Sequence, residues 1–144
     1  MHFRKTSGFR AILTAIFLSI VSCASVPVKS CDVQSMFVLV REGRIDPLKK
    51  KLQEGCATDF QLINGRTLLM TAVSQNQEEI TQLLLDRGAA VSIKDTEGQD
   101  AFLIASSIGS EKILTMLLAK GAEVNTRNNA GEGALYRAAL SGRT

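Results

Sequence analysis

The side chains with the clearest capacity for chemistry in this chain are its three cysteines, Cys23, Cys31 and Cys56. A protein thiol bonds to a second thiol, binds a metal or accepts a covalent group, and its sequence context indicates which. The only histidine is His2, which lies in a segment that we expect to be removed. Without it, the chain lacks the usual general base and the commonest metal ligand.

No other arrangement of polar residues indicates catalysis. Ser74 and Ser107 have no base to activate them. Glu78 and Glu79 fall at the expected start of a helix, where the helix dipole favours acidic side chains. The glycines follow a repeat instead of a phosphate-binding motif, and no cluster has the spacing of metal ligands. The sequence therefore predicts a chain that is not an enzyme and that uses no metal or cofactor.

Cys23 directly follows an apolar run. Residues 1–10 include three basic side chains, and residues 11–22 are almost wholly apolar. The run is shorter than the roughly 20 residues that span a bilayer. A basic start followed by such a run is typical of a secretory signal, so we expect residues 1–22 to be a signal peptide.

The end of this run, Ile20-Val21-Ser22-Cys23, resembles the bacterial lipoprotein signal. The resemblance implies that Cys23 receives a diacylglycerol thioether, that cleavage follows Ser22 and that the new amine is acylated. Residues 23–35 would then be a lipidated N-terminus and spacer. The exported chain would be lipid-anchored in the cell membrane or outer membrane. Ordinary cleavage after Ala24 is the alternative, and a misread signal would leave a cytosolic or host-directed protein.

The charge balance gives no indication of a nucleic-acid partner. The chain has 17 basic and 14 acidic residues, and three of the basic ones, Arg4, Lys5 and Arg10, lie in the expected signal peptide. Removing these three leaves 14 basic against 14 acidic residues. Nucleic-acid binding needs an excess of positive charge, so we expect no nucleic-acid partner.

Cys31 and Cys56 bracket the first expected pair of helices. In an oxidising compartment such a pair forms a disulfide, which contributes about 3 kcal/mol in the chain-entropy description. Two free buried thiols are the alternative, and the sequence leaves both open.

Glycine recurs with a period of 33 residues in three series. The series are Gly65, Gly98 and Gly131; Gly55, Gly88 and Gly121; and Gly43, Asn76, Gly109 and Gly142. A period of this length is typical of stacked units that bury their apolar faces against one another. Within one period we expect a helix over 68–75, a second over 78–87 and a turn-rich segment over 91–99. The pattern predicts an all-α repeat fold, an α-solenoid, with projecting β-hairpin loops.

Two segments make the repeat specific. Lys120-Gly-Ala-Glu-Val-Asn125 and Thr67-Leu-Leu-Met-Thr-Ala72 resemble the Gly-Ala-Asp-Val-Asn and Thr-Pro-Leu-His-x-Ala segments of ankyrin repeats. The resemblance implies a helix-turn-helix repeat domain over 36–144. Its units would be a degenerate capping repeat at 36–63, repeats at 64–96 and 97–129, and an incomplete repeat at 130–144.

Two residues are expected to begin second helices. Asp46 would cap a helix whose first residue is Pro47, and Ser110 would cap the second helix of the repeat at 97–129.

Ankyrin repeats bind proteins through their hairpin tips and the inner faces of their first helices. The resemblance therefore implies an unidentified protein partner. The implied partner-binding surface consists of Asn64, Arg66, Ser74, Gln75, Lys94, Thr96, Glu97, Gln99, Ser107, Ile108, Arg127, Asn129 and Glu132.

The incomplete last repeat suggests a second hypothesis. Leu117, Leu135, Ala138 and Leu140 would form an apolar face with no helix to cover it. End-to-end self-association through this face would make the chain a structural scaffold of the cell envelope.

Overall fold

The computed structural model describes residues 31–142 and contains seven α-helices in that range. The helices are α2 (Val33–Arg41), α3 (Ile45–Gln53), α4 (Leu68–Ser74), α5 (Glu78–Asp86), α6 (Ala101–Ile108), α7 (Glu111–Ala119) and α8 (Ala134–Leu140). The predicted signal peptide, Cys23 and most of the spacer lie outside the described residues.

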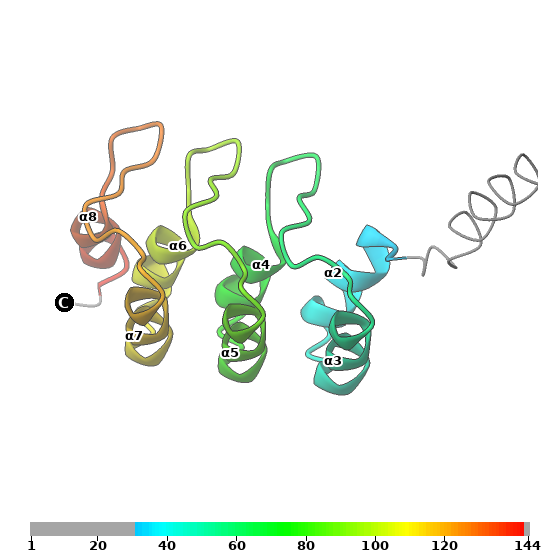
Figure 1. The fold of residues 1–144 in the computed structure, drawn as a ribbon. Coiled ribbons are helices and arrows are strands. Elements are labelled where there is room, and N and C mark those ends of the chain that lie inside the picture. The colour runs from blue at the N-terminus through cyan, green and yellow to red at the C-terminus, as the bar shows by residue number, and fades with distance from the viewer. Residues whose placement is uncertain (1–30, 143–144) are drawn as a thin grey trace, which may run out of the picture. The chain divides into compact units, whose positions relative to one another are not determined.

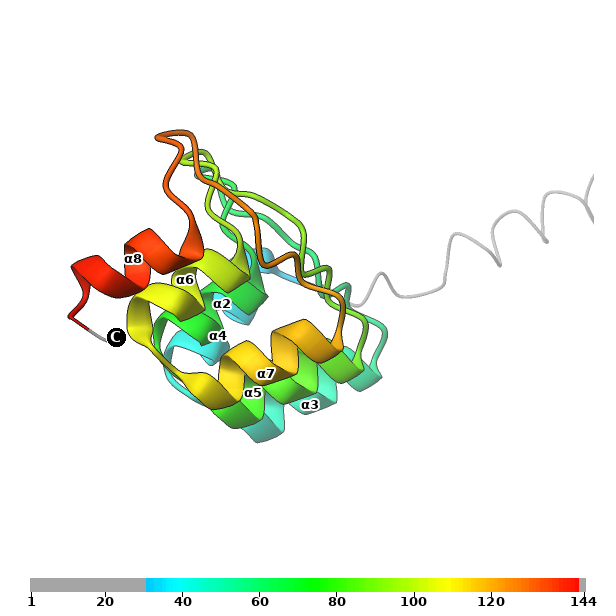
Figure 2. The same cartoon turned by 90° about the vertical axis from the view of Figure 1, so that its left-hand side faces the viewer.

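The helices form a two-layer stack. One layer contains α2, α4, α6 and α8, and the other contains α3, α5 and α7 (Figure 2). Loops project from the same side of the stack (Figure 1). We call them hairpin loop 1 (residues 57–67), hairpin loop 2 (90–100) and hairpin loop 3 (123–133). The prediction of an all-α repeat stack is confirmed.

Each repeat folds from the same local signals. In the repeat at 64–96, Thr67 caps α4, and its Oγ1 accepts a hydrogen bond from the Met70 N–H at 3.2 Å. The chain then reverses at Asn76, whose φ of +55° is the left-handed conformation that glycine adopts more readily. The next repeat has Gly109 at this position, with φ +74°.

The core lies between the two layers. Leu84 of α5 and Leu117 of α7 occupy the same position in successive repeats, and each has 0% exposed surface. Leu48 of α3 is likewise 0% exposed. Leu117 was expected on the uncovered terminal face, and this prediction is wrong. Leu117 is buried in the core, as its equivalent Leu84 is, whereas Leu135 and Leu140 are 81% and 67% exposed.

The starts of α3 and α2 differ from the expected ones, and α7 starts where expected but without the expected side-chain bond. α3 begins at Ile45 with Arg44 as its N-cap, so Asp46 and Pro47 lie within the first turn. Proline is tolerated there because the first N–H groups of a helix have no intrahelical acceptor. Ser110 is the N-cap of α7, but its side chain makes no capping hydrogen bond. α2 begins at Val33, before the expected start of the domain, because Asp32 caps it by accepting from two backbone N–H groups.

The hairpin loops contain no β-strands among the described residues. Their strand-like pairing is limited to isolated bridges between Gln61 and Thr67 and between Arg127 and Gly133. The predicted β-hairpins are therefore hairpin-shaped loops, whose backbone groups bond within the loop, to local side chains and to neighbouring loops.

A disulfide joins Cys31, before α2, to Cys56, after α3, with the Cα atoms 5.6 Å apart.

Candidate partner-binding surface

Each hairpin loop is held in shape by one side chain near its tip. In loop 2, Asp95 Oδ1 accepts from the backbone N–H groups of Glu97 and Gln99, both at 2.9 Å. In loop 3, Asn128 Oδ1 accepts from Ala130 N–H at 3.0 Å and from Glu132 N–H at 2.9 Å. Asp95 N–H also donates to the Gln99 carbonyl and Asn128 N–H to the Glu132 carbonyl. The Asx turns therefore add to a short backbone pairing, and each loop has a defined conformation without a strand ladder.

Loop 1 is built differently at its tip. Its residue equivalent to Asp95 is Leu62, which has no side-chain acceptor. Instead Asn64 Oδ1 accepts from the Arg66 N–H at 3.2 Å.

The tips are bonded to one another along the stack. Thr96 N–H donates to the Asn64 carbonyl, and Asn129 N–H donates to the Glu97 carbonyl, each at 3.0 Å. The Asn129 side-chain amide also donates to the Thr96 carbonyl at 3.0 Å. Lys94 Nζ donates to the Arg127 carbonyl at 2.8 Å. The loops therefore form one continuous row, which we call the hairpin row.

Gly98 allows the tips of loops 2 and 3 to approach each other closely. A Cβ atom at position 98 would lie 2.7 Å from the backbone nitrogen of Asn129 and 2.4 Å from its Oδ1. The φ of Gly98 is also positive, at +76°. Only glycine meets both requirements without strain.

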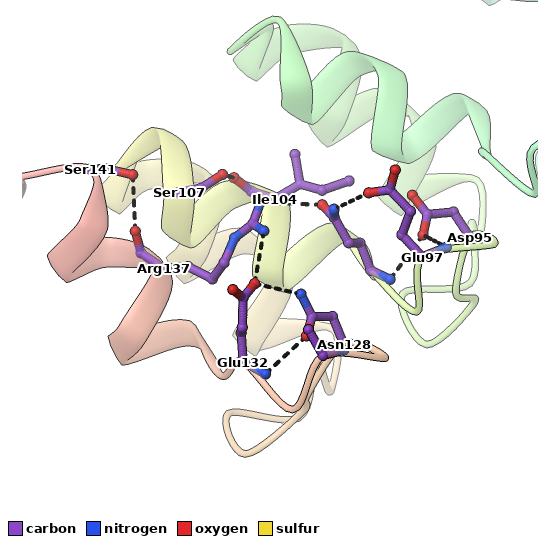
Figure 3. Close-up of polar contacts among 10 residues, drawn as sticks. Asp95, Glu97, Ile104, Ser107, Asn128, Glu132, Arg137 and Ser141 are labelled. Carbon is purple, nitrogen blue, oxygen red and sulfur yellow. Dashed lines mark hydrogen bonds and ion pairs between the residues drawn. The ribbon is translucent and has the colours of Figure 1, made fainter.

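A chain of polar contacts connects the row to the first-helix layer (Figure 3). Gln99 Nε2 donates to Glu97 Oε2 at 2.6 Å, and Arg137 Nη2 donates to Gln99 Oε1 at 3.4 Å. Arg137 also pairs with Glu132 at 3.4 Å, with side-chain exposures of 23% and 27%. Arg137 of α8 thus links loops 2 and 3. A partly exposed pair of this kind adds little stability, so its main effect is to fix side-chain positions.

Five of the predicted surface residues line one cleft. The cleft has a volume of about 180 Å³, and Asp95 lines it as well. The five predicted residues are Asn64, Arg66, Thr96, Glu97 and Gln99. It lies between the tips of loops 1 and 2. It contains one guanidinium and two carboxylates, which suits a polar partner segment with charges of both signs.

Five other predicted surface residues fall into an accessible group in loop 3 and a half-buried group in the first helices. Arg127 and Glu132 line a shallower cleft beside Tyr136, and Asn129 is exposed at the tip of loop 3. Ser74 and Ser107 are half-buried and donate to carbonyls of their own helices, at 2.9 and 2.8 Å.

Two predicted residues at helix ends behave differently from each other. Gln75 is exposed where α4 ends. Ile108 packs against the core, so it offers a partner little surface. The hairpin tips therefore present more accessible groups than the helix ends do.

Two residues of this surface were missed by the sequence analysis. Ile63 is 106% exposed at the tip of loop 1, where the equivalent positions in loops 2 and 3 hold Thr96 and Asn129. The 33-residue register could have shown that an apolar side chain stands at a polar position. Arg137 had no such signal, because its partner Gln99 lies 38 residues away.

The second-helix layer has its own charge pairs. Lys112 of α7 donates to the Glu78 carboxylate of α5, and this contact raises the pKa of Lys112. Lys120 pairs with Asp86 at 3.3 Å at the other end of the same two helices. These pairs lie across the helices that face away from the hairpin row, and they fix the register of α5 against α7.

Two structural features are absent from residues 31–142. No helix there is both long enough and apolar enough to span a bilayer. Within the same residues, no group of three or more His, Cys, Asp or Glu side chains is placed to hold a metal ion.

Comparison with known proteins identifies the fold. The family model for ankyrin repeats (3 copies) matches residues 36–128, which is more than half of the chain. No curated protein sequence matches the chain closely enough to count as a relative. The match includes most of α2, all of α3 to α7 and the first two hairpin loops. The chain belongs to the ankyrin-repeat family, whose domains typically bind proteins and are not catalytic.

Proposed function

We propose that this chain is a protein-binding module whose partner docks on the hairpin row and that a lipidated Cys23 holds it at a bacterial envelope membrane. The observation that best supports the docking surface is the set of tip-to-tip hydrogen bonds between neighbouring loops. Association is weakened by any loop that must become ordered when it binds. Loops that are already bonded to each other lose little freedom on binding.

The chemistry of the row suggests how a partner is held. Ile63 is a fully exposed apolar side chain beside the polar cleft formed by Asn64, Arg66 and Glu97. Binding energy at protein interfaces is concentrated in a few buried anchors surrounded by polar contacts. We assign the anchor role to Ile63 and the orienting role to the cleft.

Photo-crosslinking tests the docking surface. A photoreactive amino acid replaces either Thr96, at the tip of loop 2, or Thr115, an exposed threonine of α7. We expect adducts with a discrete partner from position 96 and none from position 115. Adducts from position 115 alone would place the docking surface on the second-helix layer and contradict the proposal.

The tether rests on the sequence pattern before Cys23. One acyl chain gives only marginal membrane binding, whereas two or three chains on one N-terminus make it stable. The seven residues 24–30 reach at most about 25 Å when extended. The repeat domain would therefore work close to the membrane surface.

Metabolic labelling tests the tether independently of any partner. Cells fed an alkyne-tagged fatty acid should label the wild-type protein but not the Cys23→Ala variant, and the variant should leave the membrane fraction. A Cys23→Ala protein that stays in the membrane fraction would show that the tether is wrong.

A structural scaffold is the second candidate function, and the end of the stack at α8 favours it. Leu135 and Leu140 are largely exposed. A cleft of about 650 Å³ there includes Leu114, Ala134, Leu135 and Ala138 in its lining. Two copies meeting at this end would cover that apolar surface. Light scattering on the Cys23→Ser chain distinguishes the candidates, because a docking module should be monomeric without its partner and a scaffold should not.

A further inference from the structure

The disulfide between Cys31 and Cys56 closes the first helical pair at its two ends. Cys31 lies two residues before α2, and Cys56 lies three residues after the last residue of α3. The two positions are 25 residues apart in the sequence. Cys56 is 8% exposed and belongs to the core, and Cys31 packs against it. The bond therefore encloses α2 and α3 in one covalent loop.

This helical pair is supported by fewer neighbours and a smaller buried face on its second helix than the next pair, α4 and α5. α3 buries only Leu48 and Leu52, whereas α5 buries four side chains. Within residues 31–142, α2 packs on α4 and α3 packs on α5, while α4 and α5 have neighbouring helices on both sides. In a repeat stack, a unit with one neighbouring interface is less stable than a unit with two.

We propose that Cys31 and Cys56 are a modification site for a thiol–disulfide oxidoreductase and that the first repeat keeps its packed form only when they are oxidised. The two thiols give up two electrons and two protons through a mixed disulfide. The disulfide of the oxidoreductase accepts them and leaves as a dithiol. Because Cys56 is buried in the packed repeat, its thiol reacts before or while α2 and α3 dock. The partner is thus an oxidised disulfide catalyst of an oxidising compartment.

Oxidation then acts on the hairpin row through loop 1. Cys56 immediately precedes loop 1, which carries Ile63 and the cleft residues Asn64 and Arg66. Loop 1 is fixed at its base by Asp59, whose Oδ1 accepts from Ala90 N–H at 2.9 Å. If α2 and α3 unpack on reduction, the base of loop 1 loses the helices beside it. This consequence for docking rests on the proposed docking surface, whereas the oxidation itself rests only on the proposed export of the chain.

Hydrogen exchange on the full chain tests the structural part. Every sample includes Cys23→Ser, so that Cys31 and Cys56 are the only cysteines. In the chain-entropy description, a disulfide that closes a loop of this length lowers the equilibrium population of the opened segment by roughly 300-fold. We expect the amides of α2 and α3 to exchange faster by about that factor after reduction with dithiothreitol. A Cys31→Ala/Cys56→Ala variant should match the reduced chain. Exchange that changes less than threefold on reduction would overturn the proposal.

A cellular experiment tests the enzymatic part without any docking partner. The exported chain is expressed in a bacterial strain with its disulfide oxidase and in a matched strain without it, and free thiols are counted by alkylation. We expect the bond in the first strain and two free thiols in the second. Free thiols in both strains, or complete bond formation in both, would contradict the assignment. Neither result depends on whether the hairpin row binds a protein.

Discussion

Asp100 and Thr126 form a buried hydrogen bond whose contribution to stability can be measured against a control within the same chain. Asp100 caps α6 and is 5% exposed, and its Oδ1 accepts from Leu103 N–H at 2.9 Å. Its Oδ2 accepts from the Thr126 hydroxyl at 2.5 Å. Thr126 is 6% exposed. The substitution Thr126→Val removes this donor and leaves a carboxylate oxygen buried without it.

The preceding repeat shows why the hydroxyl is needed at this position. One period earlier, the cap is Thr67 and the residue equivalent to Thr126 is Ile93. Thr67 caps α4 through its own hydroxyl and leaves no buried carboxylate oxygen. A hydroxyl thus stands at this position where the helix cap is the acidic Asp100, and an apolar side chain stands there where the cap is the neutral Thr67.

The expected loss follows from the charge of the acceptor and the shape of the replacement. A hydrogen bond to a charged group contributes about 1.5–3 kcal/mol, and valine has nearly the shape of threonine. We expect Thr126→Val to lower the free energy of unfolding by about 2–3 kcal/mol. Ile93→Val, which removes one methylene from a half-buried side chain, should lower it by about 0.5–1 kcal/mol.

Urea unfolding followed by far-ultraviolet circular dichroism provides the measurement, because the chain has no tryptophan. In an Asp100→Thr background, Thr126→Val should lose most of its effect, since the cap no longer has a second oxygen to satisfy. A loss for Thr126→Val no greater than that for Ile93→Val would refute the reasoning. So would a coupling energy below about 0.5 kcal/mol between positions 100 and 126.

Two further substitutions test the packing of the repeats by the same unfolding measurement. Gly98→Ala should destabilise the chain by about 1–2 kcal/mol more than Gly131→Ala, because both glycines have positive φ but only a Cβ at position 98 meets the backbone of Asn129. Equal losses would mean that the contact between loops 2 and 3 contributes nothing to stability. Thr81→Val should stabilise the chain by about 1 kcal/mol, because the Thr81 hydroxyl is buried without a hydrogen-bond partner and the equivalent residue one repeat later is Leu114. A lower unfolding free energy for this variant would show that the hydroxyl has a partner.

The repeat architecture could be predicted because its signals are local. Gly43, Asn76, Gly109 and Gly142 were placed at the reversals by their spacing alone, and all four have positive φ in the structure. The 33-residue period determined which apolar residues share a position, and it was the period rather than any single helix that indicated stacking.

Features that depend on neighbouring repeats could not be predicted in the same way. The N-cap of α2, Asp32, lies before the residues that resemble the family. The resemblance therefore gave no indication that a helix begins there. The loops were expected as β-hairpins because their turn residues suggest them. In the structure, only a few of their N–H groups pair across the loop, and others donate to the side chains of Asp95 and Asn128 or to adjacent tips.

The candidate surface was predicted in outline but not in detail. Its positions follow from the family resemblance. The cleft at Arg66 and the contact between Arg137 and Gln99 depend on how far apart the loops stand after stacking. That distance is a property of the assembled repeats, and no single repeat contains it.

The central claim is that the hairpin row is the docking surface. Its most direct test is to measure the Kd of the crosslinked partner for two matched variants. The tip variant combines Ile63→Ser with Glu97→Lys. The control variant combines Leu118→Ser in α7 with Glu54→Lys at the end of α3, both exposed positions of the opposite layer. Burying an isoleucine contributes about 1.5–3 kcal/mol, so the account predicts at least a tenfold higher Kd for the tip variant. The control should stay within about twofold of the wild type. An unchanged Kd for the tip variant, or an equal loss in both variants, would contradict the account.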